Sequence, residues 1–142
     1  MTGVRTCALP ISLLPSPPVP AAFAFGANDF VGLPELLRER GYRTLSAVPI
    51  QPSFWNRHVT HPGYGFSDSL FRADFGPGQK VGWGLNDRDF LRQMLARLED
   101  VPQPFFSLLI TLSLHYPFSE FPDDLRSLPE EISDGSTLGN YL

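Results

Sequence analysis

The sequence predicts an α/β fold, and three observations support this. A helix-like segment, a glycine and an apolar strand-like run follow one another in residues 28–48, and a helix followed by a strand returns in residues 86–112. Alternating helices and strands are typical of layered α/β domains. The hydrophobic share of 42% is enough for a core and excludes a wholly disordered chain. A length of 142 residues fits one domain.

The composition narrows the function classes. Fifteen prolines and twelve glycines predict short elements joined by many loops. A net charge of −4 argues against a broad basic surface for nucleic acid, but it permits a small anion held by one or two local cations. No apolar run reaches the roughly 18 to 20 residues of a membrane span, and the first residues do not resemble a secretory signal.

The first eleven residues differ in kind from the rest. Residues 1–11, which include the single cysteine Cys7, resemble the translation of a sequencing-library adapter fused in frame. We therefore expect residues 1–11 to be non-native and the native sequence to start near Ser12; the alternative is an ordinary flexible terminus. Residues 139–142 stop without a cap or polar tail, so we expect the domain, residues 12–142, to be incomplete at both ends.

The first predicted helix and strand lie between residues 28 and 48. Residues 12–26 are rich in proline and are expected to be an extended connector. A helix is predicted from Asn28, with Pro34 in its first turn and Gly41 as a left-handed C-cap. Residues 42–48 then form an apolar strand. The apolar stripe of the helix consists of Leu33, Leu36 and Leu37.

The middle of the chain is less regular. Residues 53–60 are expected to form a short helix or turn, with Ser53 as a plausible N-cap. Residues 60–84 are rich in glycine and aromatic side chains, and we expect a long irregular excursion with one or two short strands. Such excursions are often functional.

A second helix and strand complete the pattern. Asn86 or Asp87 is expected to cap an amphipathic helix that ends before Pro102. Residues 105–112 follow as a buried strand. The apolar face of the helix recurs at helical spacing and consists of Phe90, Leu91, Met94, Leu95 and Leu98.

Three residues are candidates for an anion site near the carboxyl ends of the strands, where α/β proteins bind ligands. The guanidinium of Arg57 offers a planar fork that matches phosphate or sulfate oxygens. Trp55 could form a wall of the pocket, and His115 can donate a hydrogen bond or transfer a proton near neutral pH. The alternatives are a surface ion pair for Arg57, core filling for Trp55 and a structural role for His115.

No catalytic group or metal ligand is predicted within the chain. His58 and His61 lack the spacing and the third ligand of a zinc site. Ser53, Thr111 and Ser113 could act as nucleophiles only beside a base or a metal, and no such motif is visible. A glycine-rich phosphate loop is also missing from the sequence.

With these residues laid out, the chain from Ser12 to Leu142 resembles an internal stretch of the lipoteichoic acid synthase family. These are membrane-anchored phosphoglycerol transferases of the sulfatase and alkaline phosphatase superfamily. The segments that carry the resemblance are residues 33–42, Ser53-Phe54-Trp55-Asn56-Arg57, residues 82–87, residues 98–106 and Ile110-Thr111-Leu112-Ser113-Leu114-His115.

The resemblance implies an α/β fold with a central mixed sheet between helices, here part of a sulfatase-like domain. It implies a divalent metal, manganese or magnesium, and a Thr nucleophile that takes phosphoglycerol from a phosphatidylglycerol-type lipid. Trp55, Arg57 and His115 match substrate-binding positions. The nucleophile and one metal carboxylate are expected upstream of Ser12, and an Asp-His metal pair beyond Leu142.

The resemblance also implies a parent protein at the cell membrane with an extracytoplasmic catalytic domain, attached through parts absent from this chain. Two departures leave the acceptor and the head group open: Val48 to Pro52 replaces a His-Gly-Asn type stretch, and Ser113-Leu114-His115 replaces Ser-Asn-His. Two hypotheses follow. The chain is an inactive fragment of a metal-dependent transferase or hydrolase, or it is a non-catalytic module that binds a phosphorylated glycerol or glycan.

Overall fold

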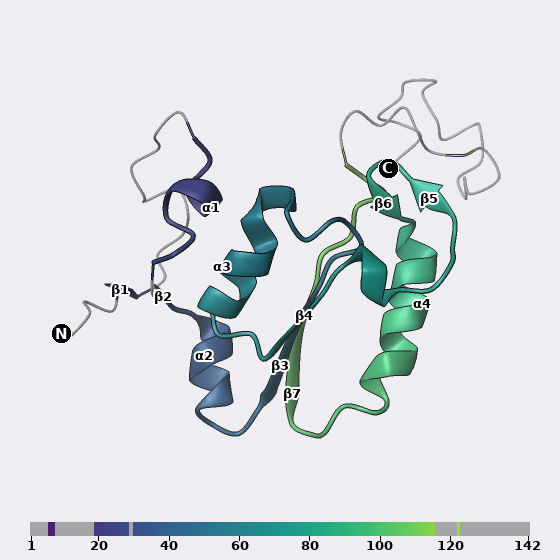
Figure 1. Cartoon of the computed structure of the whole chain (residues 1–142). Coiled ribbons are helices and arrows are strands. Elements are labelled where there is room, and N and C mark those ends of the chain that lie inside the picture. The colour runs from purple at the N-terminus through teal and green to yellow at the C-terminus, as the bar shows by residue number, and fades with distance from the viewer. Residues whose placement is uncertain (1–5, 8–18, 29, 116–121, 123–142) are drawn as a thin grey trace, which may run out of the picture.

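A computed structural model describes residues 6–7, 19–28, 30–115 and 122. Figure 1 shows a parallel sheet with α2 and α3 on one face and α4 on the other. This arrangement confirms the predicted α/β class. The helices are α1 (Ala21–Ala24), α2 (Leu33–Arg38), α3 (Arg57–Gly63) and α4 (Asp87–Leu98), and the short 3₁₀ turns are η2 (Phe54–Asn56) and η3 (Arg72–Asp74). The strands are β1 (Thr6–Cys7), β2 (Phe30–Val31), β3 (Arg43–Ala47), β4 (Asp68–Leu70), β5 (Lys80–Val81), β6 (Gly84–Leu85) and β7 (Phe105–Leu109).

The central sheet has the strand order β4-β3-β7, and all three strands run parallel. Its carboxyl edge therefore gathers the segments that follow Ala47, Leu70 and Leu109. The predicted strand 42–48 corresponds to β3, and the predicted strand 105–112 ends earlier, at Leu109. The antiparallel pair β5–β6 forms a separate small sheet, and β1 pairs in parallel with β2.

The helix before β3 ends as predicted but begins later. Residues 30–31 form β2, and α2 starts at Leu33 with the buried Pro34 in its first turn. Gly41 adopts a φ of 85°, the left-handed conformation expected of a C-cap glycine. The expectation of an extended connector over residues 12–26 is wrong at Ala21–Ala24, which form the single turn α1 after Pro20. Residues 12–18 of that connector lie outside the described residues.

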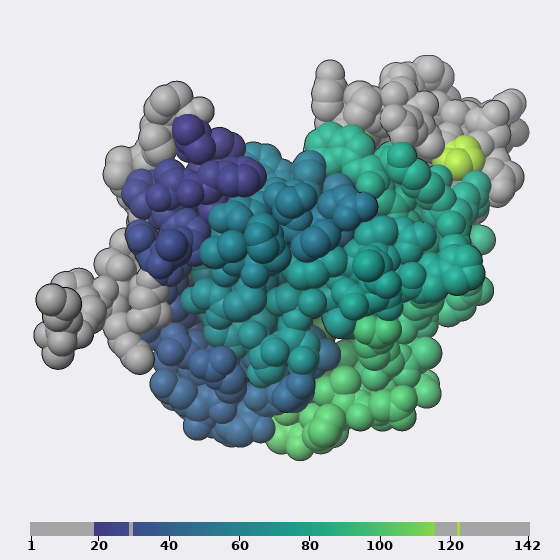
Figure 2. Space-filling model, viewed as in Figure 1, coloured from purple at the N-terminus to yellow at the C-terminus, as the bar shows by residue number. Residues whose placement is uncertain are grey.

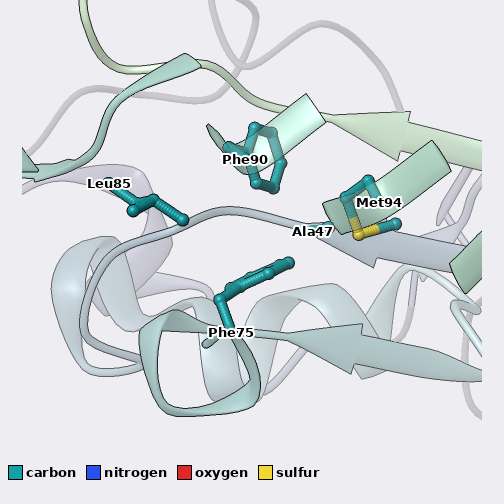
Figure 3. Close-up of a cluster of buried hydrophobic side chains, with 5 residues drawn as sticks. All are labelled: Ala47, Phe75, Leu85, Phe90 and Met94. Atoms are coloured by element: carbon teal, nitrogen blue, oxygen red, sulfur yellow. The ribbon is translucent and has the colours of Figure 1, made fainter. Parts of the chain in front are cut away.

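Helix α4 confirms the second predicted helix and covers the apolar face of the sheet. The Asn86 side chain caps it by accepting a hydrogen bond from the Asp89 backbone N–H at 2.9 Å. Phe90 and Met94 are fully buried, and Figure 3 shows both in a cluster of buried side chains. The Phe75 and Phe90 rings meet edge to face, with centroids 5.3 Å apart. The cluster consists of Ala47, Phe75, Leu85, Phe90 and Met94.

The opposite face of β3 is polar and lies against α3. Thr44 and Ser46 are buried there and are satisfied by hydrogen bonds. The Ser46 hydroxyl donates to the Ser69 hydroxyl of β4 at 2.9 Å, and it also lies 2.9 Å from His61 Nδ1 of α3. β4 belongs to the region expected to be irregular, so the excursion supplies a strand of the main sheet. Hydrogen bonds as well as packing therefore fix α3 and β4 to β3.

Candidate functional site

The chain leaves β3 through Val48 to Pro52 and enters a tight turn that carries two of the three predicted site residues. The Phe54 backbone N–H donates to the Gln51 carbonyl at 3.0 Å, and the His58 N–H donates to the Pro52 carbonyl at 3.1 Å. Ser53 occupies the N-cap position of η2, as predicted, but its side chain makes no capping hydrogen bond there. Its exposed hydroxyl lines a pocket instead.

Trp55 and Asn56 have φ values of 55° and 53°, so two consecutive residues other than glycine are left-handed. This conformation is uncommon for L-residues, and Asn tolerates it far better than Trp. The turn leaves the Trp55 side chain 46% exposed. Trp55 therefore does not fill the core, which was the alternative to a binding role.

Arg57 begins α3 immediately after this turn. Its guanidinium carbon lies 5.6 Å from the centroid of the Phe54 ring. Within the described part of the chain, the Arg57 Nη1 atom is buried and has no hydrogen-bond partner. Burial lowers the pKa of Arg57, although a guanidinium remains charged at any physiological pH. A buried cationic donor without a partner is costly in a protein interior, and an anion would satisfy it.

His61, one turn further along α3, supports this arrangement as a neutral side chain. Burial, together with the smaller effect of the nearby charge of Arg57, lowers its pKa to about 4. Its ring stacks on Phe71 at a centroid distance of 6.2 Å, and its Nδ1 is bonded to Ser46. His61 at neutral pH therefore adds no second positive charge beside Arg57.

His115 reaches the same edge of the sheet from β7. Its backbone N–H donates to the Leu112 carbonyl at 3.1 Å, and its ring centroid lies 3.9 Å from that of Trp83. The loop that carries it is fixed to the start of α4. Asp87 Oδ1 accepts hydrogen bonds from the Leu112 and Ser113 backbone N–H groups at 2.9 and 3.0 Å, and the Ser113 hydroxyl accepts one from the Asp87 N–H at 2.9 Å.

Aromatic rings connect the three predicted residues. The ring of Trp83 lies 3.9 Å from that of His115 and 5.1 Å from that of Phe54, and the Arg57 guanidinium lies 5.6 Å from Phe54. These three steps laid end to end limit the separation of His115 and Arg57 to at most about 15 Å, which one small-molecule pocket can span. The ring of Trp55 meets that of Phe54 edge to face, at a centroid distance of 6.2 Å.

A pocket of about 790 Å³ opens beside these rings, within the range of small-molecule sites. Arg57 and His115 lie outside its lining, but each contacts a ring that lines it. Most of the lining is apolar, with hydroxyl and amide groups from two side chains. The lining residues are Pro20, Phe23, Ile50, Gln51, Ser53, Phe54, Trp55 and Trp83.

The sequence analysis missed three residues of this site. Trp83 was placed only in the irregular excursion, although a tryptophan between Gly82 and Gly84 in a short turn is a signal of an exposed ring. Asp87 was interpreted as a possible helix cap, and Asn56 was only part of the motif. Their contacts lie 25 to 34 residues away in the sequence, so no local pattern reveals them.

The described residues contain no group of three or more His, Cys, Asp or Glu side chains that could hold a metal ion. The divalent metal implied by the resemblance therefore does not fit the ligands in this part of the chain. In the same residues, no helix is long and apolar enough to cross a membrane.

Comparison with known proteins identifies the family. A sulfatase family model matches residues 10–137. The chain belongs to the sulfatase family. It is 33% identical over 132 residues to the lipoteichoic acid synthase-like protein YvgJ of Bacillus subtilis, covering 91% of this chain and 21% of that protein. It is 32% identical over 130 residues to the lipoteichoic acid synthase of Staphylococcus aureus, covering 88% of this chain and 20% of that protein.

Solved structures give the same result for this sulfatase-family chain. The lipoteichoic acid synthase LtaP from Listeria monocytogenes matches with a TM-score of 0.78 at 29% identity, over 89% of this chain and 32% of that one. A protein of the alkaline phosphatase superfamily from Vibrio parahaemolyticus matches with a TM-score of 0.69 at 26% identity, again over 89% and 32%. The chain thus spans about a fifth of the length of the curated relatives and a third of the solved chains.

Proposed function

We propose that the chain carries the phosphate-binding part of a sulfatase-like phosphoglycerol transferase or hydrolase, with a phosphatidylglycerol-type lipid as donor. The buried Arg57 Nη1 atom carries this proposal, because a cationic donor that has no hydrogen-bond partner among the described residues, next to an aromatic pocket, suits one phosphate oxygen. The family membership and the similarity to lipoteichoic acid synthases support the same substrate class.

In this proposal, each residue contacts a different part of the ligand. Arg57 binds the phosphoryl oxygens as a charged donor, and His115 donates from its place beside the Trp83 ring. Trp55 and Trp83, both partly exposed, pack against the glycerol carbons or the first part of an attached chain. During phosphoryl transfer, charge spreads over the equatorial oxygens, so donors already aimed at them lower the barrier.

The rest of the reaction depends on groups that the resemblance assigns to other parts of the parent protein. A manganese or magnesium ion would activate the nucleophile and neutralise phosphoryl charge when bound, and the described residues do not supply its ligands. The parent would act in the bacterial envelope, outside the membrane and attached to it through segments absent from this chain. We therefore expect the isolated chain to bind without turnover.

Tryptophan fluorescence tests the binding directly, because the chain has two tryptophans and both line the pocket. Glycerol 1-phosphate should change the emission at concentrations where glycerol has no effect. Arg57→Gln should weaken binding about 10- to 100-fold, the value of a hydrogen bond to a charged group. The matched control is Arg92→Gln, which removes an exposed guanidinium paired with Asp89 on α4.

Two results would contradict the proposal. Equal binding of glycerol and glycerol 1-phosphate would exclude a phosphate site, and an unchanged affinity of Arg57→Gln would exclude Arg57 from it. A third measurement tests the expected inactivity. Phosphodiesterase turnover by the isolated chain with manganese, abolished by Arg57→Ala, would show that the chain contains a complete active site.

A further inference from the structure

The turn that carries Trp55 and Arg57 has a conformation that its own sequence does not favour. Among the described residues, Trp55 and Asn56 are the non-glycine residues with positive φ, and they are adjacent. Each left-handed L-residue brings its Cβ close to a backbone carbonyl oxygen, so such conformations persist only where surrounding contacts fix them. Uncommon backbone conformations of this kind concentrate at ligand sites.

The contact that fixes this turn comes from a segment more than thirty residues earlier. The Asn56 side-chain amide donates to the Ala22 carbonyl of α1 at 3.0 Å, and the Asn56 backbone N–H donates to Ser53 at 3.0 Å. Gly26 leaves room for this amide, because a Cβ at Gly26 would lie 2.7 Å from Asn56 Nδ2. Figure 2 shows the purple N-terminal segment lying directly against the blue-green middle of the chain.

The same hydrogen bond joins two segments that line the pocket. Pro20 and Phe23, within two residues of Ala22, line it, and so does Trp55, the neighbour of Asn56. Since Arg57 follows Asn56 directly, the φ of Asn56 also sets the direction in which α3 starts. A single side chain therefore controls the relative placement of the apolar wall, the Trp55 ring and the guanidinium.

We propose that Asn56 is a positioning residue of the anion pocket. It tolerates the left-handed conformation, and its amide fastens the turn to α1, so that Trp55 and Arg57 are held ready for the ligand. The identity of the ligand rests on the proposed function, whereas the role of Asn56 in the turn does not.

Three substitutions at Asn56 separate its two contributions. Asn56→Gly permits the left-handed conformation without the amide, Asn56→Asp tolerates the conformation but cannot donate to Ala22, and Asn56→Ala disfavours the conformation and lacks the amide. Gly26→Ala leaves the turn sequence intact, but its Cβ would crowd both the Ala22 carbonyl oxygen and Asn56 Nδ2, so it displaces both partners of the hydrogen bond.

The first readout needs no ligand. NMR spectra should show strong intraresidue HN–Hα NOEs at positions 55 and 56, as left-handed residues do, in the wild type, Asn56→Gly and Asn56→Asp. In Asn56→Ala these NOEs should weaken and the Trp55 indole resonance should shift. Retention of both signals in Asn56→Ala would overturn the proposal. Should Asn56→Ala fail to fold, a Trp55 indole resonance unchanged by both Asn56→Gly and Gly26→Ala would overturn it as well.

The second readout is affinity for glycerol 1-phosphate. Asn56→Gly and Gly26→Ala should bind about two- to tenfold more weakly, the value of one neutral hydrogen bond. Asn56→Asp should lose more than this, because its carboxylate adds a negative charge next to Arg57 and repels the anion. Asn56→Ala should lose about five- to thirtyfold, because only a fraction of molecules retain the competent turn. Tighter binding by Asn56→Gly than by Asn56→Ala would support the proposal, because a simple loss of rigidity predicts the reverse order: glycine makes the turn more flexible than alanine does. Equal affinity of Asn56→Ala and the wild type would overturn the proposal. If the wild type itself does not bind glycerol 1-phosphate, the proposed function is refuted, and the NOE measurement alone decides on the role of Asn56.

Discussion

Replacing Asp87 by alanine should release the loop that carries His115 while leaving the sheet folded. One carboxylate oxygen of Asp87 accepts hydrogen bonds from the backbone N–H groups of Leu112 and Ser113, both of which are buried. The Asp87→Ala change leaves two buried donors without an acceptor. A hydrogen bond to a charged group contributes about 1.5–3 kcal/mol, and the two bonds share one oxygen, so we expect a local cost of about 3 kcal/mol.

Native-state hydrogen exchange measures this cost residue by residue. A change of about 1.4 kcal/mol is a factor of ten, so the Leu112 and Ser113 amides should exchange about 100-fold faster in Asp87→Ala. Asp87→Asn keeps an acceptor oxygen without the charge and should show about half this effect in kcal/mol. The amides of β3 should change much less, because the loop opens without unfolding the sheet.

Asp89→Ala is the matched control at the same helix end. It removes another carboxylate from the first turn of α4, but its hydrogen bonds go to Asn86, the Gln79 backbone and Arg92, not to the loop. The Leu112 and Ser113 amides should therefore keep their protection in this variant. Unchanged exchange of these amides in Asp87→Ala, or equal acceleration in both variants, would refute the assigned role of Asp87.

Three further predictions concern stability. Burial keeps the pKa of His61 at about 4, below the usual 6.5, so the unfolded chain takes up a proton before the folded chain does. The free energy of unfolding should therefore fall as the pH drops from about 6.5 to 4. Urea melts of His61→Gln should lack this fall, and a His61→Gln profile equal to that of the wild type would contradict the role of His61. Gly41→Ala should lower the free energy of unfolding by about 1 kcal/mol, through its positive φ alone. Gly65→Ala should lower it by about 1–3 kcal/mol more, because its Cβ would also lie 2.5 Å from atoms of α2. Equal losses in denaturant melts would show that the surroundings of Gly65 relax to accept the methyl group. Phe90→Ala, in the fully buried core, should cost about 3–5 kcal/mol, and Leu95→Ala, 62% exposed on the same helix, less than about 0.5 kcal/mol; similar losses for the two would mean that α4 buries a different face.

The regular parts of the fold could be predicted because their signals are local. In α4, the apolar spacing and the Asn86 cap agree with each other, and Gly41 marks the end of α2 by its need for positive φ. The one or two short strands expected within residues 60–84 are present as β4 and β5, but the sequence could not locate them, because tertiary contacts decide where they form. β4 is three residues long and contains Asp68 and Ser69, so only its pairing with β3 makes it a strand.

The candidate site was predictable in its chemistry but not in its geometry. Arg57 and His115 stand out by residue type after strand-like runs, and both reach the edge of the sheet where they were expected. The left-handed Trp55 could not be expected, because tryptophan seldom adopts that conformation without an external constraint. Trp83 and Asp87 act through residues distant in sequence, and a single sequence carries no signal of such pairs.

The strand order also determines in which order a newly synthesised chain can assemble the parts of the site. β3 and β4 leave the ribosome close together and enclose the turn with Trp55 and Arg57, so this half can form as soon as the two strands pair. β7 joins the other edge of β3 only after α4 has been made, and His115 comes last. A chain halted before Asp87 would contain every residue of the pocket lining but would lack β7 and His115, so synthesis through His115 is the step that completes the site.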